Sequence, residues 1–108
     1  MIFPADENGD VLRRMLAAGD DLTKPRDIDF NHVFAKEEEA QRFVDAVRQL
    51  GFDKVSHRFW SEKKMWDARV VVFMTPAHAD ISRIESKFDS LAREFLGRAD
   101  GWGCLAVQ

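Results

Sequence analysis

Two neighbouring segments, 55–60 and 65–74, have the composition and alternation of β-strands, and only four polar residues, 61–64, separate them. Side chains alternate between the two faces of a strand, and such a short polar connection favours a hairpin. With a four-residue loop, Trp60 lies opposite Met65, and Arg58 lies opposite Asp67 as an opposite-charge pair. The pairs on the other face are then Phe59 with Trp66, His57 with Ala68 and Val55 with Val70. This hairpin constrains the fold strongly, because a loop that differs by one residue would put Arg58 beside Ala68.

The segments before the hairpin predict a helix, a strand and a second helix. Apolar residues in 11–16 lie on one helical face, and Gly19 is well suited to end that helix. Alternation over 28–34 predicts the strand. Three acidic residues, 37–39, favour a helix N-terminus through the helix dipole, and helical spacing of apolar residues continues until Gly51.

The segments after the hairpin predict a helix and a last strand. Thr75 is a favourable N-cap residue and Pro76 suits the first helical position, so we expect a helix from there to Gly97. A glycine-rich turn then leads into a short apolar strand within 101–107.

A leading helix followed by the order βαββαβ predicts an α+β, ferredoxin-like sandwich. In this fold a four-stranded antiparallel sheet has the spatial order 4-1-3-2, and both helices cover one face. The length of 108 residues suits one domain. We therefore expect a single domain over 1–108, with the leading helix and turn in 1–24 and the βαββαβ core in 25–108.

The two faces of the predicted sheet differ in composition. The helix-covered face collects Ile28, Phe30, Phe34, Phe59, Trp66, Val70 and Val72. The other face, called the open face below, receives Val33, Val71, Phe73, Leu105 and Val107, ringed by Asp29, Asn31, Arg58, Asp67 and Arg69. An apolar patch of this kind needs a cover. The leading helix, a second copy of the chain in a homodimer, or a partner protein could supply it.

Charge and cysteine content exclude several classes of protein. The net charge of -3 has the wrong sign for binding nucleic acid by electrostatics alone, so direct nucleic-acid binding is disfavoured. A single cysteine, Cys104, cannot form an intramolecular disulfide and is expected to be a small buried apolar residue. The N-terminus lacks signal-peptide features, and no apolar run approaches the ~18 residues of a membrane span. We expect a cytoplasmic protein with no membrane contact.

The histidines do not form a recognisable catalytic set. None of His32, His57 and His78 is spaced from an acid or a nucleophile as catalytic residues require. His32 and His57 fall on the inward face of two strands that the third strand would separate, which makes a zinc pair unfavourable. His32 and His57 are expected to be hydrogen-bonded histidines of the core or its rim, and His78 a residue of a first helical turn. The sequence therefore predicts no enzyme activity, no cofactor and no metal.

Three segments resemble the regulator of ribonuclease activity B (RraB) family. They are 99–104, which contains the sequence Asp-Gly-Trp-Gly at 100–103, the strand 29–34 before an acidic helix start, and the Gly51-Phe52 step. The resemblance spans most of 12–107. It implies an α+β, ferredoxin-like fold in a small cytoplasmic bacterial protein without catalytic activity. It also implies a partner, ribonuclease E, whose activity falls when its non-catalytic scaffold region is contacted.

Three hypotheses for the function follow. The first is a non-enzymatic regulatory domain that binds a protein such as ribonuclease E or a related scaffold, with predicted contacts at Arg58, Trp60, Asp67, Arg69, Val71, Phe73, Trp102 and Leu105. The second is a small-ligand or enzymatic domain that uses His32, Asn31 and Asp29 in a pocket between sheet and helix. The third is weak direct RNA binding through Arg58, Lys63, Lys64 and Arg69, which predicts salt-dependent affinity. The aromatic pattern of an RNA-recognition module is not met, because only Phe73 qualifies on the open strands.

Overall fold

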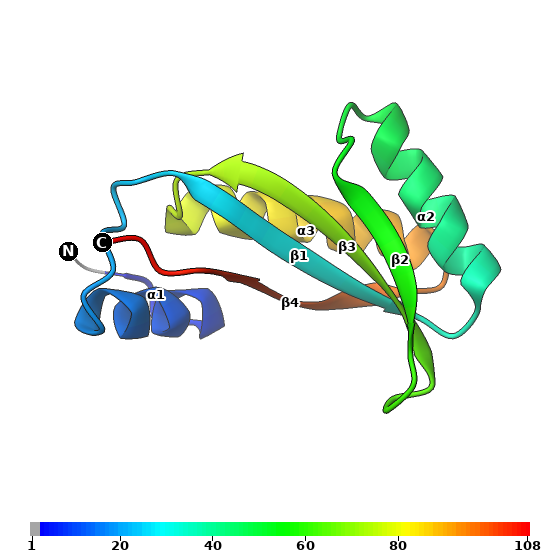
Figure 1. Ribbon diagram of the computed structural model, residues 1–108, viewed down its shortest axis with the longest axis horizontal. Coiled ribbons are helices and arrows are strands. Elements are labelled where there is room, and N and C mark those ends of the chain that lie inside the picture. Colours follow the sequence, from blue (N-terminus) through cyan, green and yellow to red (C-terminus); the bar gives the residue numbers. More distant parts are fainter. Residues whose placement is uncertain (1–2) are drawn as a thin grey trace.

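The computed structural model describes residues 3–108 and contains three helices and one four-stranded antiparallel sheet. The elements are α1 (Glu7–Ala17), β1 (Arg26–Phe34), α2 (Glu37–Gln49), β2 (Val55–Trp60), β3 (Met65–Met74), α3 (His78–Glu94) and β4 (Arg98–Cys104), as labelled in Figure 1. The strands lie in the order β2-β3-β1-β4, which is the predicted order 4-1-3-2. The α+β, ferredoxin-like prediction is therefore confirmed.

The β2–β3 hairpin has the predicted register. Trp60 pairs with Met65 and Arg58 pairs with Asp67, and the four-residue loop 61–64 connects them. The central strand β1 pairs with β3 on one side and with β4 on the other, so Phe30 lies between Val70 and Trp102. These registers fix which side chains face the helices and which face away from them.

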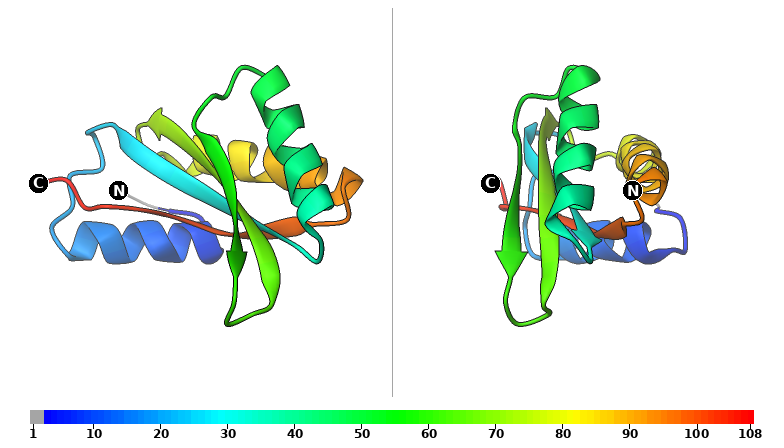
Figure 2. Two further views of the ribbon diagram at one scale, coloured as in Figure 1. Left: turned by 45° about the vertical axis from the view of Figure 1, so that its right-hand side comes forward. Right: turned by 90° about the vertical axis from the view of Figure 1, so that its right-hand side faces the viewer.

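The hydrophobic core lies between the sheet and the helices. Helices α2 and α3 lie on the same side of the sheet, as Figure 2 shows in its right-hand view. Phe30 and Phe88 are fully buried there, with ring centroids 5.9 Å apart in an edge-to-face arrangement. Helix α1 packs beside α3 and buries Leu12 in the same core. The leading helix therefore adds to the covered side, and the open face keeps the side chains of alternate strand residues.

The last strand begins earlier than predicted. β4 spans Arg98–Cys104, whereas the sequence predicted a strand within 101–107. The glycine-rich stretch is part of the strand, because Arg98 and Ala99 already pair with β1 and a bulge between the pairs of Phe30 and His32 absorbs Gly101 at φ 95°. Leu105 and the residues after it lie outside the sheet.

Helix α3 begins later than predicted. Ala77 takes the N-cap position in an extended conformation, and neither Thr75 nor Pro76 is helical. The backbone N–H of Ala77 donates to the Thr75 carbonyl at 2.8 Å, so a turn occupies the predicted first helical residues. The helix ends at Glu94, before Gly97. Gly97 lies against Phe34 so closely that an added Cβ would sit 2.2 Å from its ring.

Two strand residues differ from the prediction in how exposed they are. Phe59 was expected under the helices but is 50% exposed, because the tip of the β2–β3 hairpin extends past α2 (Figure 1). Val33 was expected in the exposed patch of the open face but is only 2% exposed, at a register position between Asp67 and Arg98. The apolar residues of the open face are therefore gathered away from Val33.

Candidate binding surface on the open sheet face

The open face has an apolar end, which we define by Val71, Phe73 and Leu105. Phe73 is 68% exposed and Leu105 is 85% exposed, and Val71 is half-buried between them and the charged residues. Val71 and Leu105 line a hollow of about 540 Å³. The other lining residues are Arg26, Asp27, Asp29, Arg69, Cys104 and Val107. Exposed apolar side chains around a hollow with a charged rim are typical of protein-binding surfaces.

The opposite end of the open face is charged. We call it the hairpin end and define it by Arg58, Trp60, Asp67 and Arg69, which line a smaller hollow of about 240 Å³ together with Asn31 and Asp100. The Arg58 Nε lies 3.9 Å from a carboxylate oxygen of Asp67, and the Arg58 side chain is 72% exposed. Arg69 donates through Nε to Asn31 Oδ1 at 3.3 Å. Both guanidinium groups are therefore oriented by neighbours while still facing solvent.

Asp67 is the unusual residue of the hairpin end. It is buried among its neighbours on a face that no helix covers. Burial raises the pKa of the Asp67 carboxyl because the charged form loses solvation, and the nearby cations Arg58 and Arg69 oppose this shift. A carboxylate held in this way can accept N–H donors from a bound molecule without first shedding much water.

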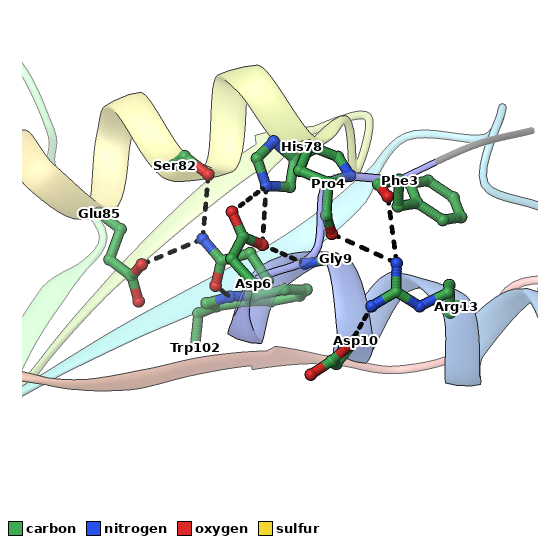
Figure 3. Close-up of polar contacts among 11 residues, drawn as sticks. Phe3, Pro4, Asp6, Gly9, Asp10, Arg13, His78, Ser82, Glu85 and Trp102 are labelled. Carbon is green, nitrogen blue, oxygen red and sulfur yellow. Dashed lines mark hydrogen bonds and ion pairs between the residues drawn. The ribbon is translucent and has the colours of Figure 1, made fainter.

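Trp102 is the one predicted contact residue that does not lie on the open face. It pairs with Phe30, packs against the core and donates its indole N–H to Asn8 Oδ1 at 2.8 Å. The Asn8 amide in turn donates to Ser82 Oγ at 3.0 Å and to Glu85 Oε1 at 3.1 Å on α3. Figure 3 shows Trp102 below these α3 side chains, at the junction of α1, α3 and β4. The Asp-Gly-Trp-Gly tryptophan therefore secures the leading helix.

A second contact at this junction joins Asp6 and His78. Asp6 is the N-cap residue of α1, where its carboxylate accepts the Gly9 backbone N–H at 2.7 Å. The same carboxylate lies 2.9 Å from His78 Nε2 in the first turn of α3 (Figure 3). The Gly9 hydrogen bond is the main cause that lowers the pKa of Asp6, and His78 adds to it.

The structure does not assemble the alternative site at His32, Asn31 and Asp29. Strand alternation turns His32 into the core, while Asn31 faces the other way and donates to Asp29 at 3.0 Å. His32 is 1% exposed and its ring lies 4.7 Å from the Phe43 ring, with Nδ1 3.3 Å from the Ala68 carbonyl oxygen. Burial lowers the pKa of His32 to about 4. The prediction of a hydrogen-bonded core histidine is confirmed.

A buried ion pair that sequence reasoning missed shapes the apolar end. Arg26 and Asp20 are both nearly inaccessible, and their side chains meet at 2.7 Å. Arg26 also donates to the Leu105 carbonyl at 3.1 Å, and Asp20 accepts the Val107 backbone N–H at 3.2 Å. The pair therefore fixes the chain after β4, which carries the exposed Leu105 side chain.

Residues 3–108 were searched for metal sites and for membrane-spanning helices. Within this range no group of three or more His, Cys, Asp and Glu side chains is placed to hold a metal ion. No helix in the described part of the chain is long and apolar enough to cross a membrane. His57 Nε2 lies 3.6 Å from a carboxylate oxygen of Glu37.

Residues 3–108 form a ferredoxin-like α+β domain in which both core helices lie on one face of the sheet and no described helix covers the opposite face. Residues 5–104 match the family model described as RraB, Regulator of ribonuclease activity B. The chain belongs to the RraB family. No curated protein matches the sequence.

Proposed function

We propose that this chain is a non-catalytic regulator that binds a ribonuclease E-type enzyme at its scaffold region and lowers its activity in the bacterial cytoplasm. Membership of a family of regulators of ribonuclease activity supports the regulatory part of this proposal. The engagement of His32 in the core supports the absence of catalysis, because its burial and lowered pKa make it a poor proton carrier at neutral pH.

The single observation that carries the proposal is the exposed apolar end of the open face. Phe73 and Leu105 expose most of their surface beside the half-buried Val71. Leaving such side chains in water forfeits roughly 25 cal/mol for each Å² that a partner could bury. Charged residues that include Asp27, Asp29 and Arg69 line the same hollow as Val71 and Leu105 and can orient the partner.

We assign the protein contact to the apolar end because neighbouring exposed apolar side chains with a polar rim mark protein-binding surfaces. The predicted contacts Phe73 and Leu105, with the half-buried Val71, meet this description. The predicted contacts Arg58, Trp60, Asp67 and Arg69 lie at the hairpin end, where the chemistry differs.

Titration of a purified ribonuclease E preparation with this chain tests the proposal, with RNA cleavage rate and binding affinity as readouts. We expect the chain to reduce cleavage and Phe73→Asp to weaken binding by about 10-fold or more, as truncation of an interface anchor does. Leu50→Asp is the matched control, because Leu50 is also half exposed but ends α2 on the helix side. Equal affinity of both variants and the parent chain would contradict the apolar-end assignment, and unchanged cleavage at saturation would contradict the regulatory role.

A further inference from the structure

The tip of the β2–β3 hairpin differs chemically from the rest of the molecule. The chain as a whole carries a net charge of -3, but the stretch 58–64 contains three cations, Arg58, Lys63 and Lys64, and one acid, Glu62. Figure 1 shows that this hairpin reaches past the helices into open space. A local positive charge on an acidic domain favours an anionic partner that approaches at this point.

Aromatic side chains accompany these cations. Trp60 is partly exposed on the open face, and the Lys63 ammonium lies 5.4 Å from the centroid of its ring. The Lys63 cation therefore lies next to the ring on which a base could stack, close enough to meet the phosphate of that nucleotide. Phe59 is half exposed on the other side of the same strand and packs edge-on against Trp66 at 5.4 Å.

The hollow beside Trp60 is of a size to hold one planar ring system. Its volume is about 240 Å³, and its walls combine one aromatic ring, two guanidinium groups, the Asn31 amide and two carboxylates. Within residues 3–108, the polar contacts found for Arg58 and Arg69 use Nε, so their Nη atoms can donate to a phosphate. Aromatic stacking next to exposed cations is the arrangement that proteins use for single-stranded nucleic acids.

The carboxylates narrow the choice of base. Guanine is the RNA base whose Watson–Crick edge presents two adjacent N–H donors, at N1 and N2, and a carboxylate can accept both. Asp67 lies in the wall of the hollow with little solvent around it, and Asp100 lies nearby. Carboxylates would repel a bare phosphate, so they favour a base in the hollow and phosphates outside it.

We propose that the hairpin end binds single-stranded RNA with one guanine in the hollow. The base stacks on Trp60 and donates its N–H groups to Asp67. The flanking phosphates lie beside Arg58, Arg69 and Lys63. Arg69 borders both hollows, but Trp60 and Asp67 line only the one at the hairpin end, so a regulator bound to its ribonuclease through Phe73 could hold a segment of RNA at the same time.

Fluorescence polarization with labelled RNA pentamers tests the site on the full chain. The probes are UUGUU and UUAUU at about 50 mM and about 200 mM salt, because phosphate contacts weaken as salt rises. We expect UUGUU to bind more tightly than UUAUU, and the affinity of both to fall with salt. Trp60→Ala should weaken binding by about 10-fold, while Trp60→Phe keeps a stacking ring and should retain most of the affinity.

Two further variants separate recognition of the base from contact with the phosphates. Asp67→Asn should remove the preference for UUGUU, because an amide offers a single acceptor oxygen. Arg58→Gln should reduce the slope of log affinity against log salt by about 0.7, the value for one phosphate contact to a single strand. Phe73→Ala, at the apolar end, is the control and should leave RNA binding unchanged. The same control separates this proposal from the protein contact, which Phe73 variants weaken and Trp60→Ala does not.

Several results would overturn the proposal. They are no polarization change for either pentamer at low salt, equal binding by Trp60→Ala and the parent chain, and free guanosine monophosphate competing as well as the pentamer. Loss of ribonuclease binding by Trp60→Ala without any RNA binding would assign the hairpin end to the protein partner instead.

Discussion

The same strands build both faces of the sheet, but the side chains on one face are buried under the helices and those on the other face project away from them. On β1, Phe30 and His32 are fully buried under the helices, while Asp29 and Asn31 project from the open face and bond to each other. On β3, Val70 is buried and its neighbours Arg69 and Val71 line hollows on the other side. The covered face supplies stability. The open face exposes charged and apolar groups, among them Arg69 and Phe73.

The largest expected difference between the faces is the effect of removing a phenylalanine. Phe88→Ala should lower the free energy of unfolding by about 3–5 kcal/mol, because it leaves a cavity among Phe30, His32 and Phe52. Phe73→Ala should change it by no more than about 0.5 kcal/mol, as is usual for exposed positions. Urea denaturation of both variants provides the measurement. Similar losses for the two would mean that the open face is covered by part of the fold.

The next-largest expected change in the free energy of unfolding concerns the ion pair of Arg26 and Asp20, which joins the covered face to the apolar end. Asp20→Ala should cost about 3 kcal/mol, since it leaves the Arg26 guanidinium buried without its partner. Asp21→Ala is the control, because Asp21 bonds Thr23 at the surface. Thermal unfolding distinguishes the two, and a loss for Asp20→Ala no larger than that of its neighbour would contradict the account.

The same pair predicts a dependence on acid pH. The hydrogen bond from Arg26, helped by that from the Val107 backbone N–H, lowers the pKa of Asp20 below its ordinary value of 3.8. The stabilisation from this carboxylate is therefore fully present above that value and is lost as the pH falls through the folded-state pKa. Asp20→Ala should lack this loss.

His32 predicts a second dependence on pH, at milder acidity. Its pKa of about 4 in the folded protein lies below the ordinary 6.5, so the unfolded chain takes up the proton first. Stability is complete above the ordinary value and falls as the pH drops towards the folded-state pKa, by about 2 kcal/mol between about pH 7 and about pH 5. Urea titrations across this range, with His32→Gln as the non-titrating control, measure it. A parent chain with the same slope as the control would show that His32 is solvated.

The smallest expected effect concerns the junction that holds α1. Asn8→Ala removes the acceptor of the Trp102 indole and the donor to Ser82 and Glu85. These groups are only partly buried, so water can replace Asn8, and the variant should cost about 1 kcal/mol in total. Gln41→Ala removes a side-chain hydrogen bond to Asp45 on the surface of α2 and should cost much less. Hydrogen exchange of α1 amides should quicken in the first variant alone. Unchanged exchange would show that apolar packing of Leu12 holds the helix.

The fold could be predicted from the sequence where short-range patterns decide it. Alternation and a four-residue loop were enough to place Arg58 opposite Asp67. The start of β4 could not be predicted in this way, because the Ala99 N–H is satisfied by Asp89 of α3, which lies ten positions away along the chain. The predicted N-cap of α3 was also wrong, because Thr75 and Pro76 form a turn before the helix and Ala77 is the N-cap residue.

The sequence predicted which face of the sheet carries the candidate site, but not the contacts that its residues make there. Alternation placed Val71, Phe73 and Arg69 on the open side of the sheet. It could not show that Asp67 is buried there, that Arg26 and Asp20 form a buried pair, or that Trp102 faces α1. Each of these depends on contacts between segments far apart in sequence. The Asp-Gly-Trp-Gly segment indicated the family, but its tryptophan has a structural role.

Chemical-shift mapping of the isotope-labelled chain with a purified scaffold segment of ribonuclease E tests most directly that the open face is the binding face. The account predicts that backbone amide shifts concentrate around Asp27, Val71, Phe73 and Leu105, with the amides of α2 and α3 unchanged. Shifts concentrated on the outer surfaces of α2 and α3, with the open face unaffected, would contradict it.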